Sequence, residues 1–140
     1  MEVIPHIENK DYFLPVGFYV QEMVNNDLCF MELQYQDFNK KRIYYGIYLR
    51  VGKWNKNVTL KQTGRNGLSC LIWAKNALIT LEKYIVDNPE LFYKLGKKEV
   101  YIIIFWDDNK RRDVYKHGLN KLGYYTKQYP TGKMLSKRII

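Results

Sequence analysis

The spacing of apolar residues predicts strands in the first part of the chain. Between Leu28 and Gln36, apolar residues occupy every second position and would form the buried face of a strand. A turn over residues 37–41 connects this segment to a second predicted strand, Arg42–Val51, so the two are expected to form an antiparallel hairpin. A third strand is predicted over Val58–Gln62, and a short one over Val16–Val20.

In the middle of the chain, the apolar residues have the spacing of a helix and no longer alternate with polar residues. Apolar residues recur every three or four positions over Leu68–Ile85, which predicts a helix of about five turns with one buried stripe. Asn88-Pro89 ends that helix or begins a short second one. A second main helix is predicted over Lys110–Leu122, where Asp107–Asn109 would cap its start and Gly123 its end.

The apolar run Glu99–Trp106 is typical of a strand buried on both faces, and Tyr124–Tyr129 and Met134–Ile140 are predicted as the last strands. The expected fold is therefore α+β, with a mixed, mostly antiparallel sheet and two main helices. A right-handed crossover would make Val58–Gln62 and Glu99–Trp106 parallel neighbours. The chain has 140 residues, no repeat and no linker, so a single domain, 1–140, is expected.

Composition narrows the class of protein. Apolar residues make up 46% of the chain and aromatic residues 16%, which excludes a disordered chain. The net charge of +9 favours an anionic ligand such as nucleic acid, an acidic membrane surface or a phosphate-bearing cofactor. Cys29 and Cys70 are too few for a disulfide framework, and neither a signal peptide nor a membrane-spanning run is evident, so a cytoplasmic protein is expected. Richness in Lys, Asn, Tyr and Ile is typical of an AT-rich bacterial or phage genome.

The junction between the third predicted strand and the first helix has the features of an anion site. Gly64 and Gly67 allow a tight turn with exposed N–H groups, the helix start adds a partial positive charge, and Arg65 adds a full one. The alternative is a glycine-rich turn without a ligand. The spacing excludes a nucleotide-binding P-loop and a dinucleotide fingerprint.

This junction and the order of elements resemble the Gcn5-related N-acetyltransferase (GNAT) superfamily. That family carries a Gln/Arg-x-x-Gly-x-Gly/Ala signature before its central helix, and its backbone amides hold the pyrophosphate of acetyl-CoA. The aligned stretch here is Gly64–Ser69, so the resemblance implies that the cofactor phosphates are held by Gly64, Arg65, Asn66, Gly67, Leu68 and Ser69. The segment before the hairpin is shorter than in the family, so the resemblance implies a divergent relative with a shortened N-terminal part.

A second region carries the same resemblance. The family has an Asn after its fifth strand, a Tyr on the following helix and a Gly-Phe or Gly-Tyr at that helix's end, and Asn109, Tyr115 and Gly123-Tyr124 match in order. The resemblance implies that Asn109 lies near the pantetheine arm and that Tyr115 protonates the departing thiolate. Glu32 is the candidate base, directly or through water, and its alternative role is that of a solvent-facing glutamate.

Three functions stay open on this basis. The resemblance implies an acyl-CoA-dependent N-acyltransferase that transfers acetyl to an amine, or a degenerate relative, with acetyl-CoA as co-substrate. The alternative is a non-catalytic nucleic-acid-binding protein, whose candidate residues are Arg50, Lys53, Trp54, Lys56, Lys61, Arg111 and Arg112. An inactive acyltransferase-like fold used for protein interaction is the third. His6, His117 and the cysteines lack metal-ligand spacing, so no metal is expected.

Overall fold

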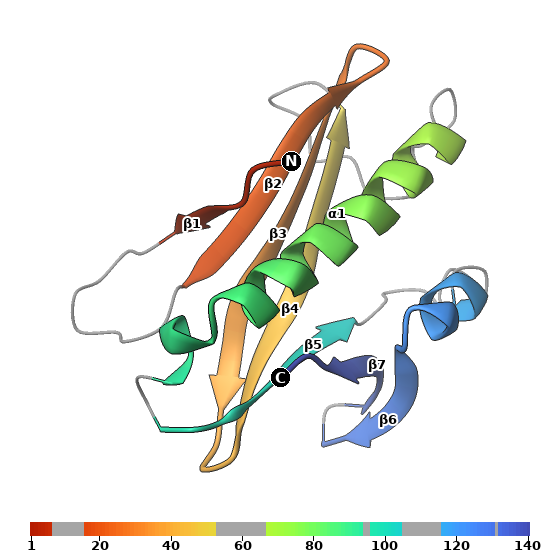
Figure 1. Cartoon of the computed structure of the whole chain (residues 1–140). Helices are drawn as coiled ribbons and strands as arrows, with labels where there is room; N and C mark the ends of the chain where they lie inside the picture. The colour runs from red at the N-terminus through yellow and green to blue at the C-terminus, as the bar shows by residue number, and fades with distance from the viewer. Residues whose placement is uncertain (7–15, 53–66, 94–95, 105–115, 131) are drawn as a thin grey trace.

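The computed structural model describes residues 1–6, 16–52, 67–93, 96–104, 116–130 and 132–140. Within them, one seven-stranded sheet is crossed on one face by a long helix (Figure 1). The strands are β1 (Ile4–His6), β2 (Gly17–Val24), β3 (Asp27–Phe38), β4 (Arg42–Gly52), β5 (Glu99–Ile104), β6 (Tyr125–Tyr129) and β7 (Gly132–Arg138). The long helix is α1 (Gly67–Asp87), a short 3-10 helix η2 (Pro89–Leu91) follows it, and residues 116–121 are also helical.

The sheet has the order β1-β2-β3-β4-β5-β7-β6. The β4–β5 pair is parallel, and the other neighbouring pairs are antiparallel. The predicted α+β class, with a mixed and mostly antiparallel sheet, is therefore confirmed. Two helical segments accompany the sheet, α1 and residues 116–121.

The hairpins follow from local turn chemistry. Asn25 and Asn26 connect β2 to β3 with φ values of 49° and 69°, the left-handed conformations that a two-residue hairpin turn requires and that Asn tolerates. In the β3–β4 turn, Asn39 Oδ1 accepts hydrogen bonds from the backbone N–H groups of Lys41 at 2.9 Å and Arg42 at 2.8 Å. The predicted β3–β4 hairpin is therefore confirmed.

One predicted pairing is wrong. The parallel neighbour of β5 is β4, through Arg42–Gly46, and not the segment Val58–Gln62, which lies outside the described residues. β5 pairs with β4 on one edge and with β7 on the other, so another strand has no edge to join there. The crossover therefore leads from β4 to β5.

The core lies between α1 and one face of the sheet. The helix contributes Trp73, Ala77, Leu78, Leu81 and Ile85, all buried. The predicted stripe is confirmed in its second half, at Leu78, Leu81 and Ile85, whereas its Leu71 and Ala74 are half-buried. Opposite them, the rings of Phe18, Tyr45 and Phe92 pack edge to face, with centroids 5.2–6.1 Å apart. β5 is buried from Val100 to Ile104, as its apolar run predicts. The remaining face of the sheet, called here the outer face, carries the polar residues discussed below.

Candidate functional site

The parallel strands β4 and β5 separate at their carboxyl ends. Their pairing runs from Arg42 with Glu99 to Gly46 with Ile103. Beyond it, β5 ends at Ile104, whereas β4 continues to Gly52 in a different direction (Figure 1). The edge of β4 after Gly46 therefore has no partner from β5 among the described residues. In open sheets with parallel strands, ligands bind outside these carboxyl ends.

The N-terminus of α1 lies farther along β4, at the level of the carboxyl end of that strand and of the β2–β3 turn (Figure 1). Its first N–H groups have no partner within the helix and carry the positive end of the helix dipole. The first turn contains no acidic residue that would neutralise this charge. The β2–β3 turn is close by, because Asn25 Nδ2 donates a hydrogen bond to Ser69 Oγ at 3.3 Å. The predicted phosphate residues Gly67, Leu68 and Ser69 thus open α1, at a position suited to an anion.

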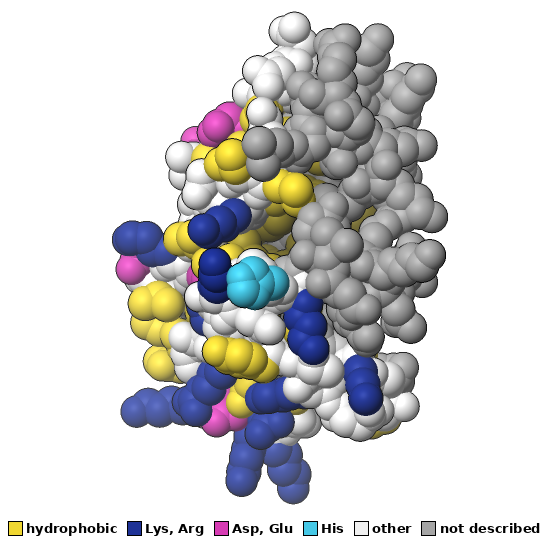
Figure 2. Space-filling view, turned by 90° about the vertical axis from the view of Figure 1, so that its right-hand side faces the viewer, with side chains coloured by type: hydrophobic (Ala, Val, Ile, Leu, Met, Phe, Trp, Pro, Cys, Tyr) yellow, Lys and Arg dark blue, Asp and Glu magenta, His cyan; other side chains and the backbone are white. Residues whose placement is uncertain are grey.

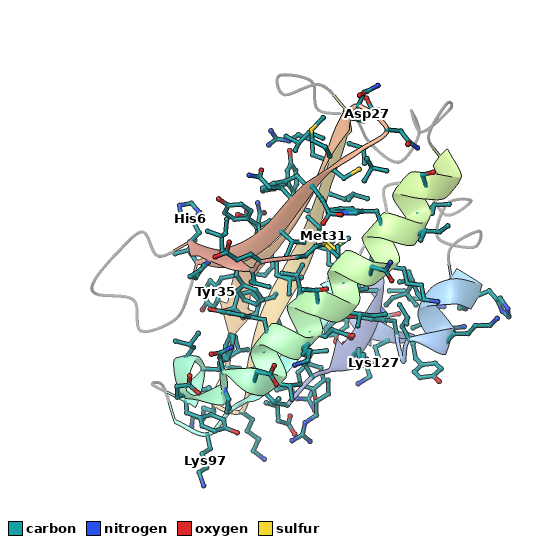
Figure 3. All side chains as sticks on the ribbon, turned by 45° about the horizontal axis from the view of Figure 1, so that its top comes forward. His6, Asp27, Met31, Tyr35, Lys97 and Lys127 are labelled. Carbon is teal, nitrogen blue, oxygen red and sulfur yellow. The ribbon has the colours of Figure 1, made fainter. Side chains whose placement is uncertain are left out.

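Glu32 lies on β3, one strand away from the open edge. It pairs across the sheet with Tyr48, two residues beyond the last β4–β5 pair. Its Oε1 accepts a hydrogen bond from Gln34 Nε2 at 2.8 Å, and its Oε2 is 4.0 Å from His6 Nδ1 at the β1 edge of the sheet (Figure 3). With 13% of the side chain exposed, the carboxylate is half-buried but accessible. A polar cluster therefore adjoins the opening on the outer face.

Aromatic rings flank this carboxylate. Tyr19 on β2 and Tyr48 on β4 are its direct cross-strand neighbours, and the ring of Phe30 lies 5.1 Å from Tyr19 and 6.4 Å from Tyr48. The Arg50 guanidinium stacks on Phe30 and Tyr48, 5.5 Å from each centroid, and its buried Nε has no hydrogen-bond partner among the described residues. An organic amine that approaches Glu32 would therefore contact apolar rings, which favour its binding.

Gly17 makes room for the carboxylate. A Cβ at this position would lie 3.2 Å from Glu32 Cδ and 3.0 Å from the carbonyl oxygen of Leu33. A larger residue would therefore require the Glu32 side chain to shift by a few tenths of an ångström. This close approach was not predictable from the sequence, because it depends on the β2–β3 register, in which Gly17 pairs with Gln34.

Several predicted site residues lie outside the described residues. These are Gly64, Arg65, Asn66, Asn109 and Tyr115 from the predicted acyl-CoA site, and Lys53, Trp54, Lys56, Lys61, Arg111 and Arg112 from the predicted nucleic-acid site. Of the latter set, Arg50 is described, and it is engaged with two rings as stated above. Sequence reasoning missed Tyr19 and the pairing of His6 with Glu32, which only the strand register brings together.

No family model matches the chain, and neither a curated protein nor a solved structure does. In the described part of the chain, no helix is both long and apolar enough to cross a membrane. The same residues include no group of three or more His, Cys, Asp or Glu side chains that could hold a metal ion.

Proposed function

We propose that this protein is an acyl-CoA-dependent N-acyltransferase of GNAT-like fold that transfers an acetyl group to an amine. The observation that carries the proposal is the separation of the parallel strands after Gly46 and Ile103, with α1 beginning farther along β4, beside the β2–β3 turn. Such an opening gives a thioester access to the edge of β4, while the start of α1 offers N–H groups to the phosphates.

The start of α1 fits a pyrophosphate. Gly67 at the first helical position has no side chain that would block a phosphate, and Ser69 offers a hydroxyl as a donor. The first turn contains no acidic residue that would repel the phosphates. In the proposed site, Gly64–Ser69 hold the phosphates and Asn109 contacts the pantetheine arm of acetyl-CoA. The acyl group then reaches the open edge of β4, where a backbone N–H polarises the thioester carbonyl.

The proposed reaction is a direct transfer. The amine nitrogen attacks the carbonyl carbon, so a C–N bond forms and the C–S bond breaks. The proton lost by the amine passes to Glu32, directly or through water, and Tyr115 protonates the thiolate of CoA. Glu32 suits this role because its carboxylate is accessible, is oriented by Gln34, and lies one strand away from the open edge of β4.

Calorimetric titration with acetyl-CoA tests the proposal, using Gly67→Glu as the variant. A glutamate at the helix start would occupy the phosphate position and repel the phosphates, so the affinity should fall at least about tenfold, a loss of about 1.4 kcal/mol. The substitution itself should leave the fold intact, because an acidic residue near a helix N-terminus is favourable.

Asn76→Glu is the matched control. It adds the same charge to an exposed position of the same helix, away from its start. We expect wild-type affinity for this variant. Absence of saturable binding by the folded wild-type protein, or equal affinity in Gly67→Glu, would contradict the proposal. Binding without transfer to any amine would identify a degenerate relative that has kept only the cofactor site.

A further inference from the structure

We infer that the end of the sheet opposite the proposed acyl-CoA site binds single-stranded nucleic acid. The surface, called here the basic end, gathers cationic side chains at the amino ends of β4 and β5 and on the adjoining outer face. They are Lys40, Lys41, Arg42, Lys97, Lys98, Lys127 and Arg138. Lysine and arginine side chains crowd the lower part of the molecule in Figure 2. Lys97 and Asp27, which belongs to the β2–β3 hairpin, lie at opposite ends of the molecule in Figure 3.

Two of the chain segments that form the basic end are hydrogen-bonded to each other. The backbone N–H of Glu99 donates to the carbonyl oxygen of Lys41 at 2.8 Å, and Lys98 Nζ donates to the carbonyl oxygen of Asn39 at 3.0 Å. The β3–β4 turn is thereby fixed beside the segment that enters β5. Lysines that are 57 residues apart in the sequence, such as Lys41 and Lys98, therefore present their charges on one surface.

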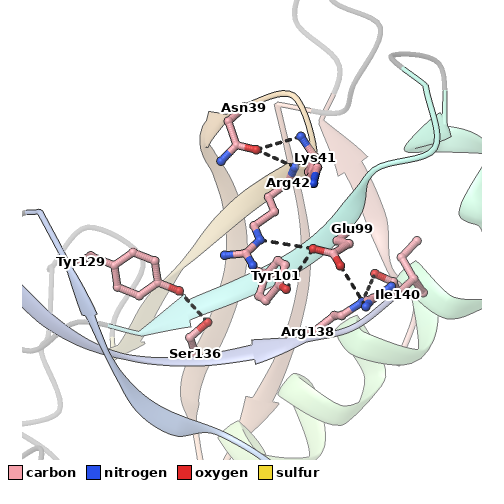
Figure 4. A network of polar contacts seen from close by, with 9 residues as sticks. All are labelled: Asn39, Lys41, Arg42, Glu99, Tyr101, Tyr129, Ser136, Arg138 and Ile140. Carbon is pink, nitrogen blue, oxygen red and sulfur yellow. Dashed lines mark hydrogen bonds and ion pairs between the residues drawn. The ribbon is translucent and has the colours of Figure 1, made fainter.

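Neighbouring carboxylates do not neutralise this surface. Its seven cationic side chains are accompanied, in the same segments, by Asp37 and Glu99, which leaves a local net charge of +5. Glu99 is shared by two arginines, with Oε2 at 3.2 Å from Arg42 Nε and Oε1 at 2.9 Å from Arg138 Nη1 (Figure 4). The shared carboxylate fixes both guanidinium groups on the outer face while it neutralises one charge.

Aromatic rings are interleaved with these cations. The rings of Tyr44, Tyr101 and Tyr129 are in contact, with centroids 5.6 Å and 6.0 Å apart. The Arg42 guanidinium and Lys127 Nζ lie 5.1 Å and 5.3 Å from the Tyr101 centroid. Tyr129 is held by its hydroxyl, which donates to Ser136 Oγ at 2.9 Å (Figure 4). Tyr44 and Tyr129 remain half-exposed, so each offers ring surface to a ligand.

This combination selects a single-stranded nucleic acid among polyanions. The cations can contact successive phosphates, and the exposed ring surfaces can stack on bases. Only a single strand offers free bases, because in a duplex the bases are stacked inside the helix. An acidic protein segment would use the charges but not the rings. The basic end differs from the set predicted from the sequence, and it is independent of the proposed acyl-CoA site at the carboxyl ends of the same strands.

The test measures fluorescence anisotropy with labelled dodecamers of single-stranded RNA and DNA. The variant Lys40→Glu/Lys41→Glu/Lys97→Glu changes three exposed residues of the basic end and should weaken binding at least tenfold. The salt dependence should also flatten, because each lost phosphate contact removes about 0.7 from the log–log slope for single strands. Tyr129→Leu should weaken binding by about fivefold or more through lost stacking.

The control variant Lys75→Glu/Lys116→Glu/Lys121→Glu changes the net charge equally at other described positions. It should retain most of the affinity, and an equal loss would overturn the proposal by showing that net charge alone is responsible. Absence of binding by the wild-type protein, or competition by polyglutamate as effective as that by unlabelled oligonucleotide, would also overturn it. The basic-end variant should keep its acetyl-CoA affinity, so a failure of one proposal leaves the other testable.

Discussion

At the scale of single residues, Glu32 owes its environment to its cross-strand neighbours. On an isolated strand it would be an ordinary solvent-facing glutamate. In the sheet it lies between Tyr19 and Tyr48, over Gly17, and near His6. A carboxylate that is partly covered and still accessible is suited to accept a proton from a bound amine.

The Glu32→Gln variant tests this role. The amide keeps the size of the side chain but cannot accept the proton, so kcat for acetyl transfer should fall by about 10²–10⁴-fold while the affinity for acetyl-CoA is unchanged. Release of CoA thiol in the presence of a panel of amines measures kcat. Glu22→Gln, an exposed position on the neighbouring strand β2, should behave as wild type. Equal turnover in Glu32→Gln would remove Glu32 from the mechanism.

The candidate base was predictable from the sequence as a residue type on a strand, whereas its partners were not. Alternation places Glu32 on the polar face of its strand, but it says nothing of which residues lie opposite. The contact with His6 requires the short strand β1, which the sequence did not reveal because it spans only Ile4–His6 and contains Pro5. Register is a long-range property, so the pattern of one segment cannot determine it.

At the scale of elements, α1 is connected to the C-terminal strands by a polar contact in the interior. Glu82 is 8% exposed, and its Oε1 accepts a hydrogen bond from the Tyr124 hydroxyl at 3.0 Å and lies 2.7 Å from Lys137 Nζ. Burial and the neighbouring Glu82 raise the pKa of Tyr124, so its hydroxyl remains a donor at neutral pH. This contact orients α1, whose N-terminus belongs to the proposed site.

Glu82→Ala is therefore expected to lower the free energy of unfolding by about 2–3 kcal/mol, because a buried hydroxyl and an ammonium lose their acceptor. Since the raised pKa of Tyr124 affects stability only above its unfolded value of about 10, the loss should be the same from about pH 6 to about pH 9. Urea unfolding followed by circular dichroism measures this loss of stability.

The control is Asp87→Ala, which breaks the exposed Lys83–Asp87 pair and should lower the free energy of unfolding by at most about 0.5 kcal/mol. Equal costs for the two variants would contradict a special role for Glu82.

The elements themselves were largely predictable. The second half of the α1 stripe, the alternation of β3 and the apolar run of β5 are local patterns that agree with the structure. The parallel partner of β5 was not predictable, because the sequence patterns of Val58–Gln62 and of Arg42–Gly46 both predict a strand that precedes the helix. The choice between them depends on long-range pairing: β3 occupies one edge of β4, and β7 occupies the other edge of β5.

At the scale of the whole molecule, the parallel pair β4–β5 joins two parts of one sheet. β1 to β4 form an antiparallel meander, and β5, β7 and β6 complete the sheet beyond it. The two proposed sites lie at opposite ends of this pair, so the two proposals predict that one molecule binds acetyl-CoA and a polyanion at the same time. Substitutions at one end should therefore leave binding at the other end unchanged.

The same connections predict that the chain unfolds in one cooperative transition. Phe18 is fully buried and contacts the rings of Tyr45 on β4, Tyr84 on α1 and Phe92 after η2. Phe18→Ala should lower the free energy of unfolding of the whole molecule by about 3–5 kcal/mol.

Tryptophan fluorescence and circular dichroism should report coincident urea transitions in this variant and in the wild type. Phe18→Leu, which keeps an apolar side chain at the same position, should lose markedly less stability than Phe18→Ala. We expect a single transition because the β4–β5 pairing and the Glu82–Lys137 contact both join the meander and its helix to the C-terminal strands. Two separate transitions, one of them insensitive to Phe18→Ala, would show that the C-terminal strands fold independently.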